Sequence, residues 1–316
     1  MSVQYDKTGA VVALPVEIRT AAHDAVVRRW LAHADLTRTT MRRDPLTRML
    51  GVLNLPCPDS GLGALRLWGQ TGDRPGVWIA AADPVYLEPR LDHLCLHSLQ
   101  GAVPASELGA LVDHLQRTLV DEGDYGFARV GSCVYLRAEH PVATADSSPA
   151  IIDGQAPDGF MPNGADAADY LRLSSEVEMA LHDHEVNERR EAEGLPPVNG
   201  LWLWGGGIAP QVQTVPHPPL FGGDALLKGH WHSRTAAVID WPGTIAGCIE
   251  QSPDGFVAVV PGGEAHRVGE LLLELRECLA AKRVSRLTLL FADGVEARIL
   301  RSQAWRFWRR SISLPD

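Results

Sequence analysis

MALHDHEVNERREAEGLPPVNGLWLWGGG, the stretch Met179–Gly207, joins a helical pattern to a proline turn and an apolar run that ends in three glycines. We predict one long helix over 165–193, because Gly194 suits a helix C-cap and Pro196-Pro197 prevent further helical turns. The run Val198–Trp204 is predicted as a buried strand. The glycines after it would let backbone amides approach a ligand without side-chain hindrance. The stretch therefore predicts a helix, a turn and a strand whose end borders a pocket.

Strand and helix patterns alternate over the rest of the chain. Apolar residues at spacings of three and four predict helices over 16–34, 106–120 and 268–281. Short apolar runs predict strands over 9–15, 76–82, 91–99, 133–137, 236–240, 256–260, 287–292 and 295–300, the last two joined by a hairpin turn at Asp293-Gly294. Residues 54–64 are predicted as a loop. This alternation predicts an α/β fold with a mixed sheet and helices on both faces.

The 316 residues of the chain are about twice the usual length of a single domain. A stretch rich in proline and glycine, 146–165, is predicted as a linker or a long loop. We therefore expect an N-terminal α/β region over 1–145 and a C-terminal α/β region over 166–316.

Composition restricts the class of protein. The formal net charge of −10 argues against nucleic acid as a partner, since neutralising phosphates requires a surplus of cations. The five cysteines are scattered and never in CxxC spacing, which argues against a disulfide framework or a zinc ribbon. No run approaches 18 apolar residues, and Met1–Thr8 lacks the apolar stretch of a secretory signal. These features predict a cytoplasmic protein without a membrane span.

Polar side chains continue the apolar stripe of the predicted long helix. Steps of four residues extend this stripe through Ala180 to His184, and Asn187 follows on the same side. Buried polar groups need hydrogen-bond partners. Arg189 or Arg190 could hold an anion, because a guanidinium fork matches phosphate or carboxylate. Two interpretations stay open: a ligand pocket, or side chains that cap the helix and tie down the proline turn.

Three motifs of this stretch carry a family resemblance: HxxNxxR over 184–190, GxPxxN over 194–199 and LWLWGGG over 201–207. Over residues 70–240 the chain is similar to a proteobacterial family of regulatory proteins of the RpfE type. Further matches to that family lie at ADPV (82–85), YLR (135–137), MPNG (161–164) and EM (178–179). The chain resembles more distantly the archaeal-type cofactor-independent phosphoglycerate mutases of the alkaline phosphatase superfamily.

The resemblance implies a partial phosphoglycerate-mutase-like architecture and a set of ligand-binding residues. Such a set would hold a small phosphorylated or carboxylate ligand. Its members are His184, Asn187, Arg190, Asn199, Trp204, Gly205, Gly206 and Gly207.

The resemblance does not extend to the catalytic machinery of these mutases, which need two metal ions and a serine nucleophile. In this chain residues 1–60 show no strand that ends in Asp-Gly and is followed by such a serine. Where the mutases have Pro-Pro-His-Asp, this chain has Ser148–Ile151, with Asp153 nearby. We therefore expect a non-catalytic regulatory or ligand-sensing protein without a cofactor. The alternative is a metal-dependent phosphoglycerate mutase-like phosphotransferase that uses manganese or zinc.

Histidines outside this stretch are weak metal-binding candidates. On a strand, His230 and His232 would point the same way, as would His93 and His97. Histidines in such positions are usually just solvated, and that is the alternative interpretation of both pairs. The first pair belongs to a set that could supply zinc or manganese ligands: His217, Asp224, His230, His232 and Asp240.

Residues 298–310, near the C-terminal end of the sequence, form a run rich in arginine and aromatic residues. Interleaved arginines and aromatic rings suit nucleic acid or an acidic partner, and the net charge disfavours the former. The same pattern also fits aromatic rings packed on the protein with solvated arginines. Nine tryptophans make a protein partner conceivable, although a core explains most of them.

Overall fold

A computed structural model describes residues 9–39, 44–120, 124–164 and 167–305, and the chain forms two compact units. Unit 1 comprises Met1–Cys57 and Val212–Asp316, and unit 2 comprises Pro58–Gln211. Both ends of the chain thus contribute to unit 1. The predicted division at 146–165 is wrong, because this stretch lies inside unit 2 and Gln155 bridges to Leu96 there.

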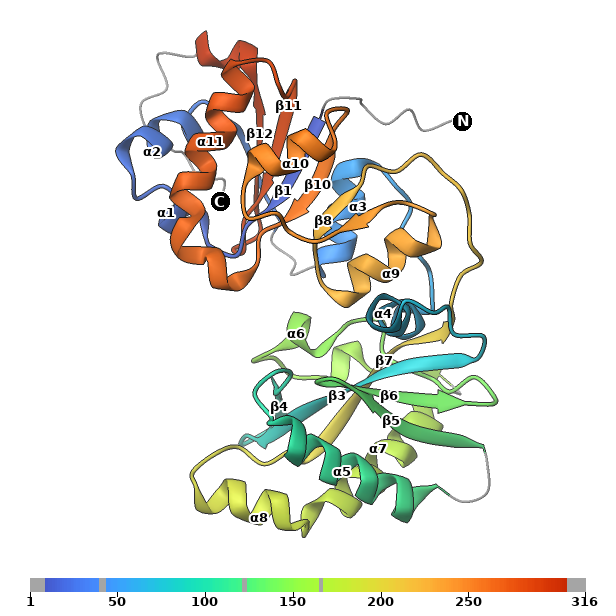
Figure 1. Cartoon of the computed structure of the whole chain (residues 1–316). Coiled ribbons are helices and arrows are strands. Elements are labelled where there is room, and N and C mark those ends of the chain that lie inside the picture. Colours follow the sequence, from blue (N-terminus) through green and yellow to red (C-terminus); the bar gives the residue numbers. More distant parts are fainter. Residues whose placement is uncertain (1–8, 40–43, 121–123, 165–166, 306–316) are drawn as a thin grey trace. The chain divides into compact units, whose positions relative to one another are not determined.

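Unit 1 is built on a seven-stranded mixed sheet with the order β2-β12-β11-β1-β10-β8-β9 (Figure 1). The five strands from β11 to β9 pair in parallel, whereas β12 pairs antiparallel with β11 and β2. The strands are β1 (Gly9–Ala13), β2 (Asp35–Arg38), β8 (Leu220–Gly222), β9 (Val238–Ile239), β10 (Phe256–Val259), β11 (Arg286–Leu290) and β12 (Val295–Leu300). The predicted hairpin between β11 and β12 is confirmed, and Gly294 has the positive φ that its turn requires.

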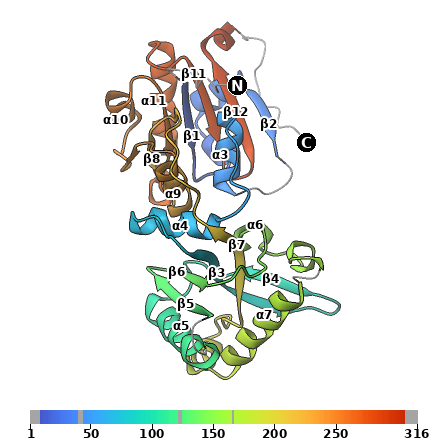
Figure 2. The same cartoon turned by 90° about the vertical axis from the view of Figure 1, so that its right-hand side faces the viewer.

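Helices cover both faces of this sheet, as the α/β prediction states (Figures 1 and 2). The helices of unit 1 are α1 (Ile18–Ala21), α2 (Ala25–Leu31), α3 (Pro45–Leu53), α9 (Ala225–Ser233), α10 (Ile245–Gln251), α11 (Val268–Ala280), η3 (Gly262–Arg267) and η4 (Arg301–Trp305). One face, with Ala10 and Phe256, packs against α1, α2, α10 and α11 in a single core. Val11 and Val257 alternate with these residues and therefore point to the opposite face. Helices α3 and α9 lie on that side of the sheet (Figure 1).

Unit 2 contains a five-stranded antiparallel sheet centred on one long strand, β3. This strand pairs with β4, β6 and β7, and β6 pairs with β5. The strands are β3 (Trp78–Pro89), β4 (Leu94–Ser98), β5 (Tyr125–Val130), β6 (Cys133–Ala138) and β7 (Gly200–Ile208).

The helices of unit 2 also lie on two sides of their sheet. They are α4 (Leu62–Thr71), α5 (Ala105–Leu119), α6 (Pro149–Ile152), η1 (Asp158–Phe160), α7 (Ala167–His182) and α8 (Glu185–Ala192). The core shared with α5 and α7 contains Leu108, Leu173 and Leu203. α4 packs on the opposite face, where Gly63 lies directly against the backbone of Ala81.

Three predicted elements differ from the structure for local reasons. The long helix over 165–193 is two helices, because His184 adopts an extended backbone and caps α8. The helix over 16–34 is likewise interrupted, since Asp24 caps α2 through the N–H groups of Val26 and Val27. The strand over 76–82 does not stop at Asp83-Pro84, because a strand position whose backbone N–H is not needed tolerates proline.

Two further differences concern unit 2. The loop predicted over 54–64 gives way to α4 at Leu62. The strand predicted over 91–99 is shorter, and His93 lies outside it in an exposed turn. His93 and His97 therefore do not share one side of a strand. Within the described ranges, no helix combines the length and the apolar character needed to cross a bilayer.

Candidate functional site

Asn187 ties α8 to the chain that follows the proline turn. Its Nδ2 donates to the carbonyls of Leu181 (2.8 Å) and Val198 (2.9 Å), and its Oδ1 accepts from the Val198 N–H at 2.9 Å. The residue is 2% exposed. The amide oxygen and the amide nitrogen of Asn187 thus already have backbone partners. The side chain ties down the proline turn, as the second of the two interpretations of this stretch predicts.

His184 caps the N-terminus of α8. Its Nδ1 accepts a hydrogen bond from the Val186 N–H at 3.2 Å. Its ring packs edge-on against the His114 ring, with the two ring centroids 4.9 Å apart. Burial, followed by the nearby His114, lowers the pKa of His184 below its ordinary value. A neutral imidazole that accepts a backbone hydrogen bond is a capping group.

Arg190 holds a carboxylate of the protein itself. The guanidinium donates to Glu107 Oε2 on α5 at 2.9 Å and to the Pro196 carbonyl at 2.9 Å. The Arg190 side chain is 3% exposed and that of Glu107 is 17% exposed. This ion pair joins α8 to α5. It engages the Arg190 guanidinium, which the sequence suggested as the binding group for an anionic ligand.

Asn199 connects the turn to the central strand of unit 2. Its Oδ1 accepts from the Leu87 N–H at 2.7 Å, and its Nδ2 donates to the Leu87 carbonyl at 2.9 Å. The amide therefore pairs with the β3 backbone much as a neighbouring strand would.

At each of the three glycines near the end of β7, other atoms of the protein occupy the space that a side chain would need, so no open pocket lies there. A Cβ at Gly207 would lie 2.5 Å from the Gly61 nitrogen, and one at Gly205 would lie 2.8 Å from the Leu62 Cβ. A Cβ at Gly206 would meet the Trp78 ring. Close packing of β7 against the start of α4 and against Trp78 thus explains why these positions lack side chains.

Trp204 belongs to a buried polar network between β3, β7 and α4. Its Nε1 donates to Asp83 Oδ2 at 2.8 Å, and Arg66 donates to both oxygens of Asp83 at 2.7 and 2.9 Å. Asp83 is fully buried. Burial alone would lower the pKa of Arg66, but the adjacent Asp83 carboxylate raises it above its ordinary value. The network fixes α4 to the sheet.

The predicted ligand-binding residues do not line one common hollow. Asn187 and Asn199 border a hollow of about 670 Å³ in unit 2, but the other six predicted residues do not line it. Its remaining lining contains the carboxylates Glu178 and Glu191, together with His182. Binding of a ligand by the predicted set stays a prediction.

The weak metal candidates of unit 1 are only partly brought together. His217 and His230 lie with their ring centroids 5.6 Å apart, and His230 is fully buried. Neither ring nitrogen of His230 has a hydrogen-bond partner among the described residues. Burial lowers the pKa of His217 to about 4 and that of His230 to about 3, so both rings are neutral near pH 7.

The other three candidates do not complete a site with these rings. His232 lies on α9, not on a strand, so it points away from His230. Asp224 caps α9 by accepting from the Leu227 N–H at 2.8 Å, and Asp240 is exposed. Among the described residues, no group of three metal ligands includes any of the five candidates.

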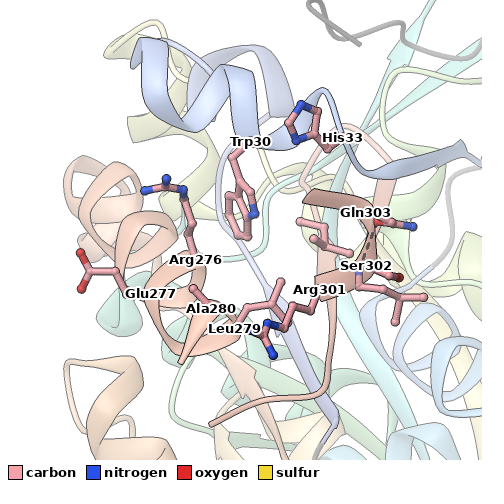
Figure 3. Close-up of a pocket in the computed structure, with 11 residues that line it drawn as sticks. Trp30, His33, Arg276, Glu277, Leu279, Ala280, Arg301, Ser302 and Gln303 are labelled. Atoms are coloured by element: carbon pink, nitrogen blue, oxygen red, sulfur yellow. Dashed lines mark hydrogen bonds between the residues drawn. The ribbon is translucent and has the colours of Figure 1, made fainter. Parts of the chain in front are cut away.

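A more apolar hollow in unit 1 was not predicted from the sequence. It has a volume of about 620 Å³ and lies between the end of α2, the end of α11 and the β12–η4 junction (Figure 3). Its lining is Trp30, His33, Arg276, Glu277, Leu279, Ala280, Ile299, Leu300, Arg301, Ser302 and Gln303. Three segments distant in sequence form it. The only sequence signal was Arg301 in the basic run, of which residues 306–310 lie outside the described residues.

The charged side chains of this hollow are mainly cationic. Figure 3 shows Arg276 beside the Trp30 indole, Arg301 below it and Gln303 on the side away from Arg276. Neither arginine has an ion pair within the described part of the chain. Gln303 is held in place, since it donates to Asp35 at 2.7 Å and accepts from the Leu300 N–H at 3.1 Å. The hollow therefore combines an apolar floor with two guanidinium groups that form no ion pair with any described residue.

The carboxyl edge of the parallel strands is where catalytic groups gather in open α/β sheets. After β1 and β10 the chain of unit 1 continues with Leu14-Pro15 and Val260-Pro261. Asp224, Asp240 and Asp293 follow β8, β9 and β11. Within the described residues these carboxylates form no three-ligand group with one another or with histidine.

Comparison with known proteins relates the chain to one group of enzymes. It is 38% identical over 114 residues to the 2,3-bisphosphoglycerate-independent phosphoglycerate mutase of Methanothrix thermoacetophila, and 29% identical over 115 residues to phosphoglycerate mutase 2 of the same kind from Methanothermobacter thermautotrophicus. These stretches are 34% and 36% of this chain but only 29% of each enzyme. The chain has distant homology to archaeal-type cofactor-independent phosphoglycerate mutases of the alkaline phosphatase superfamily. No protein-family model matches it.

Two solved structures align with most of the chain. The PH0037 protein of Pyrococcus horikoshii aligns over 94% of this chain and 88% of its own, with a TM-score of 0.50 and 14% identity. A cofactor-independent phosphoglycerate mutase from Thermoplasma acidophilum aligns over 92% and 89%, with a TM-score of 0.44 and 17% identity. At such identities the likeness concerns the fold, which is α/β with a mixed seven-stranded sheet.

Proposed function

We propose that this chain is a non-catalytic regulatory or ligand-sensing protein with a phosphoglycerate-mutase-like fold. The homology supports descent of the fold from phosphoglycerate mutases. The matched stretch covers only 29% of each homologous enzyme, so the homology does not by itself extend their activity to this chain. The resemblance of the motifs over 184–207 to regulatory proteins of the RpfE type supports the regulatory part of the proposal.

The observation that carries the proposal is the hollow of Figure 3. Arg276 and Arg301 offer charge and hydrogen-bond donors to an anion, and guanidinium groups pair well with phosphate or carboxylate. Trp30 and Ile299 offer an apolar surface beside them. About 620 Å³ lies within the range of small-molecule sites. The ligand class is therefore a small phosphorylated or carboxylate compound with an apolar body.

The hollow in unit 2 suits such a ligand less well. Glu178 and Glu191 line it, and they would repel an anion. Arg190, the cation predicted for this region, is held by Glu107. Electrostatics thus favours the unit 1 hollow for an anionic ligand.

The non-catalytic part of the proposal is supported by the carboxyl edge of the unit 1 sheet. Metal-dependent phosphoryl transfer depends on clustered metal ligands and a positioned nucleophile. The described residues provide Leu14-Pro15 and Val260-Pro261 after two central strands, and no three-ligand group at this edge.

The experiment is a binding titration of the full chain with anilinonaphthalene sulfonate, a fluorescent aromatic anion, followed by competition with 3-phosphoglycerate and with an aromatic carboxylate. Saturable binding is expected at one site. The double variant R276S/R301S is expected to bind the probe at least about tenfold more weakly, since two charge-assisted contacts contribute about 1.4 kcal/mol or more.

The matched control is R172S, which removes an exposed arginine of unit 2. It changes the net charge in the same direction and leaves the hollow intact. Equal probe affinity in R276S/R301S and in R172S would contradict the proposed ligand site. Turnover of 3-phosphoglycerate by the unmodified chain would contradict the non-catalytic assignment.

A metal-dependent phosphoglycerate mutase-like phosphotransferase is the second candidate. It is favoured by the homology and by the adjacent neutral imidazoles of the half-buried His217 and the buried His230. Neutral imidazole is a good ligand for zinc and manganese sites. Activity that requires added manganese and disappears in H230A, with R276S/R301S unaffected, would establish it in place of the first proposal.

A further inference from the structure

The hairpin formed by β3 and β4 brings three metal-ligating side chains onto one face. Residues that oppose each other in an antiparallel pair project to the same side, and here Glu88 opposes Cys95 while Tyr86 opposes His97. Glu88, Cys95 and His97 are consequently neighbours on one face of the sheet, on the paired strands β3 and β4.

The distances between their ligand atoms suit a single small cation. His97 Nε2 lies 2.9 Å from Glu88 Oε2, and the ligand atoms of all three residues lie within 4.8 Å of one another. In tetrahedral zinc sites, bonds of about 2.0–2.3 Å place ligand atoms about 3.3–3.8 Å apart. Side-chain adjustments of about 1 Å would therefore close the group around zinc.

The chemistry of the donors selects the ion. One thiol, one imidazole and one carboxylate form a mixed set that favours zinc or cobalt, whereas magnesium and calcium prefer oxygen ligands alone. This is the one group of three such residues found in the described part of the chain.

The surroundings leave an open position on the site. Cys95 is 7% exposed, while the side chains of Glu88 and His97 are 30% and 36% exposed. Tyr86 stacks on the His97 ring with centroids 6.0 Å apart, which holds the imidazole in orientation. The buried thiol thus forms the floor and solvent reaches the other two ligands.

Arg90 competes with a cation at this place. Its guanidinium lies 2.7 Å from Glu88 Oε2, but its side chain is 51% exposed. An exposed ion pair contributes little to stability, so the arginine can turn into solvent when a dication binds.

We propose that Glu88, Cys95 and His97 bind one zinc ion, with water or an external ligand at the fourth position. The ion would link β3 to β4 near the hairpin end of unit 2. The site is independent of the ligand site proposed in unit 1, because it lies in unit 2 and shares no residue with that hollow.

The test uses the full chain, purified without metal and titrated with cobalt(II). A single equivalent is expected to give the visible bands of tetrahedral cobalt and a thiolate-to-cobalt charge-transfer band. Zinc should displace the cobalt stoichiometrically. X-ray absorption at the zinc edge should then show one sulfur among nitrogen and oxygen neighbours.

Variants assign the ligands. C95S should abolish the charge-transfer band, and H97Q should weaken cobalt binding by at least about tenfold. C57S and H140Q are the matched controls, since both remove exposed side chains, and neither should change the titration. Because H97Q alters a partly exposed residue, it tests the site even if C95S does not fold. Absence of the charge-transfer band in the unmodified chain, or unchanged affinity in H97Q, would overturn the proposal.

Discussion

Asn187 and Val198 form a closed pair of hydrogen bonds, in which the side-chain amide of one donates to and accepts from the backbone of the other, each at 2.9 Å. This pair holds the turn that joins α8 to β7. One bond donated and one accepted is also the pattern by which two opposed strand residues pair. From the sequence, this motif suggested a ligand pocket. In the structure, these contacts of Asn187 fix the turn.

We expect N187A to lower the free energy of unfolding by about 2–4 kcal/mol, because it leaves buried groups of Val198 and Leu181 without partners. N187D should be at least as destabilising, since a buried carboxylate cannot donate to the two carbonyls. Urea denaturation followed by circular dichroism measures both values. E188A, an exposed change on the same helix, is the control, and equal stability of N187A and E188A would contradict the structural role.

The ion pair between Arg190 and Glu107 is expected to behave as a buried interaction. E107Q should lower the free energy of unfolding by about 3 kcal/mol, because it leaves the Arg190 guanidinium buried without a carboxylate. In a double-mutant cycle, Arg190 and Glu107 should show a coupling well above that of Arg172 and Glu176, which are exposed and four residues apart on α7.

The exposed pair should contribute no more than about 0.5 kcal/mol. Couplings of similar size for the two pairs would show that Arg190 is not committed to Glu107. Its availability for an anionic ligand in unit 2 would then need to be considered again.

At Gly63, α4 packs directly against the backbone of β3. A Cβ at this position would lie 2.5 Å from the Ala81 nitrogen, which is backbone and cannot move aside easily. G63A should therefore destabilise the protein, by about 2–3 kcal/mol for an overpacked core position. Gly109 on α5 offers the opposite case, because a Cβ there would make only ordinary contacts with the Arg129 side chain at 3.6 Å and beyond. G109A should stabilise the helix by about 0.5–1 kcal/mol, and destabilisation by both changes would contradict this account.

Local patterns were sufficient for the elements whose boundaries depend on nearby residues. The helix over 106–120 and the hairpin at Asp293-Gly294 were predicted close to their observed bounds, because apolar spacing and turn chemistry specify both. Asp83 shows the limit of this reasoning. Beside Pro84 it read as the end of a strand, but Arg66 and Trp204 pair with it in the interior and the strand continues.

The candidate sites could not be predicted because they depend on pairing between distant segments. The unit 1 hollow needs α2, α11 and β12 together, and no spacing within one segment indicates it. For the β3–β4 group, His97 was noticed only through its spacing from His93, while its observed partners are Glu88 and Cys95. Which residues oppose each other in a hairpin depends on its register, and the sequence did not establish that register.

The stability of unit 1 is expected to fall in mild acid because of His217 and His230. Burial lowers their pKa values in the folded state to about 4 and about 3, below the ordinary value of 6.5. As the pH falls below 6.5, the unfolded chain takes up these protons before the folded chain does. The free energy of unfolding should then decrease by up to about 1.4 kcal/mol per pH unit for each histidine, until the pH approaches the folded-state values.

Urea denaturation between pH 7.5 and pH 4.5 measures how the free energy of unfolding depends on pH. The substitution H230L should remove the contribution of His230 to that dependence. The leucine keeps the site apolar, so its main effect on the slope comes from the lost titration of a fully buried ring. H140L is the control, because His140 is exposed. A slope that is the same in H230L and in H140L would show that His230 is already protonated, or that its ring has solvent access, in the folded protein near neutral pH.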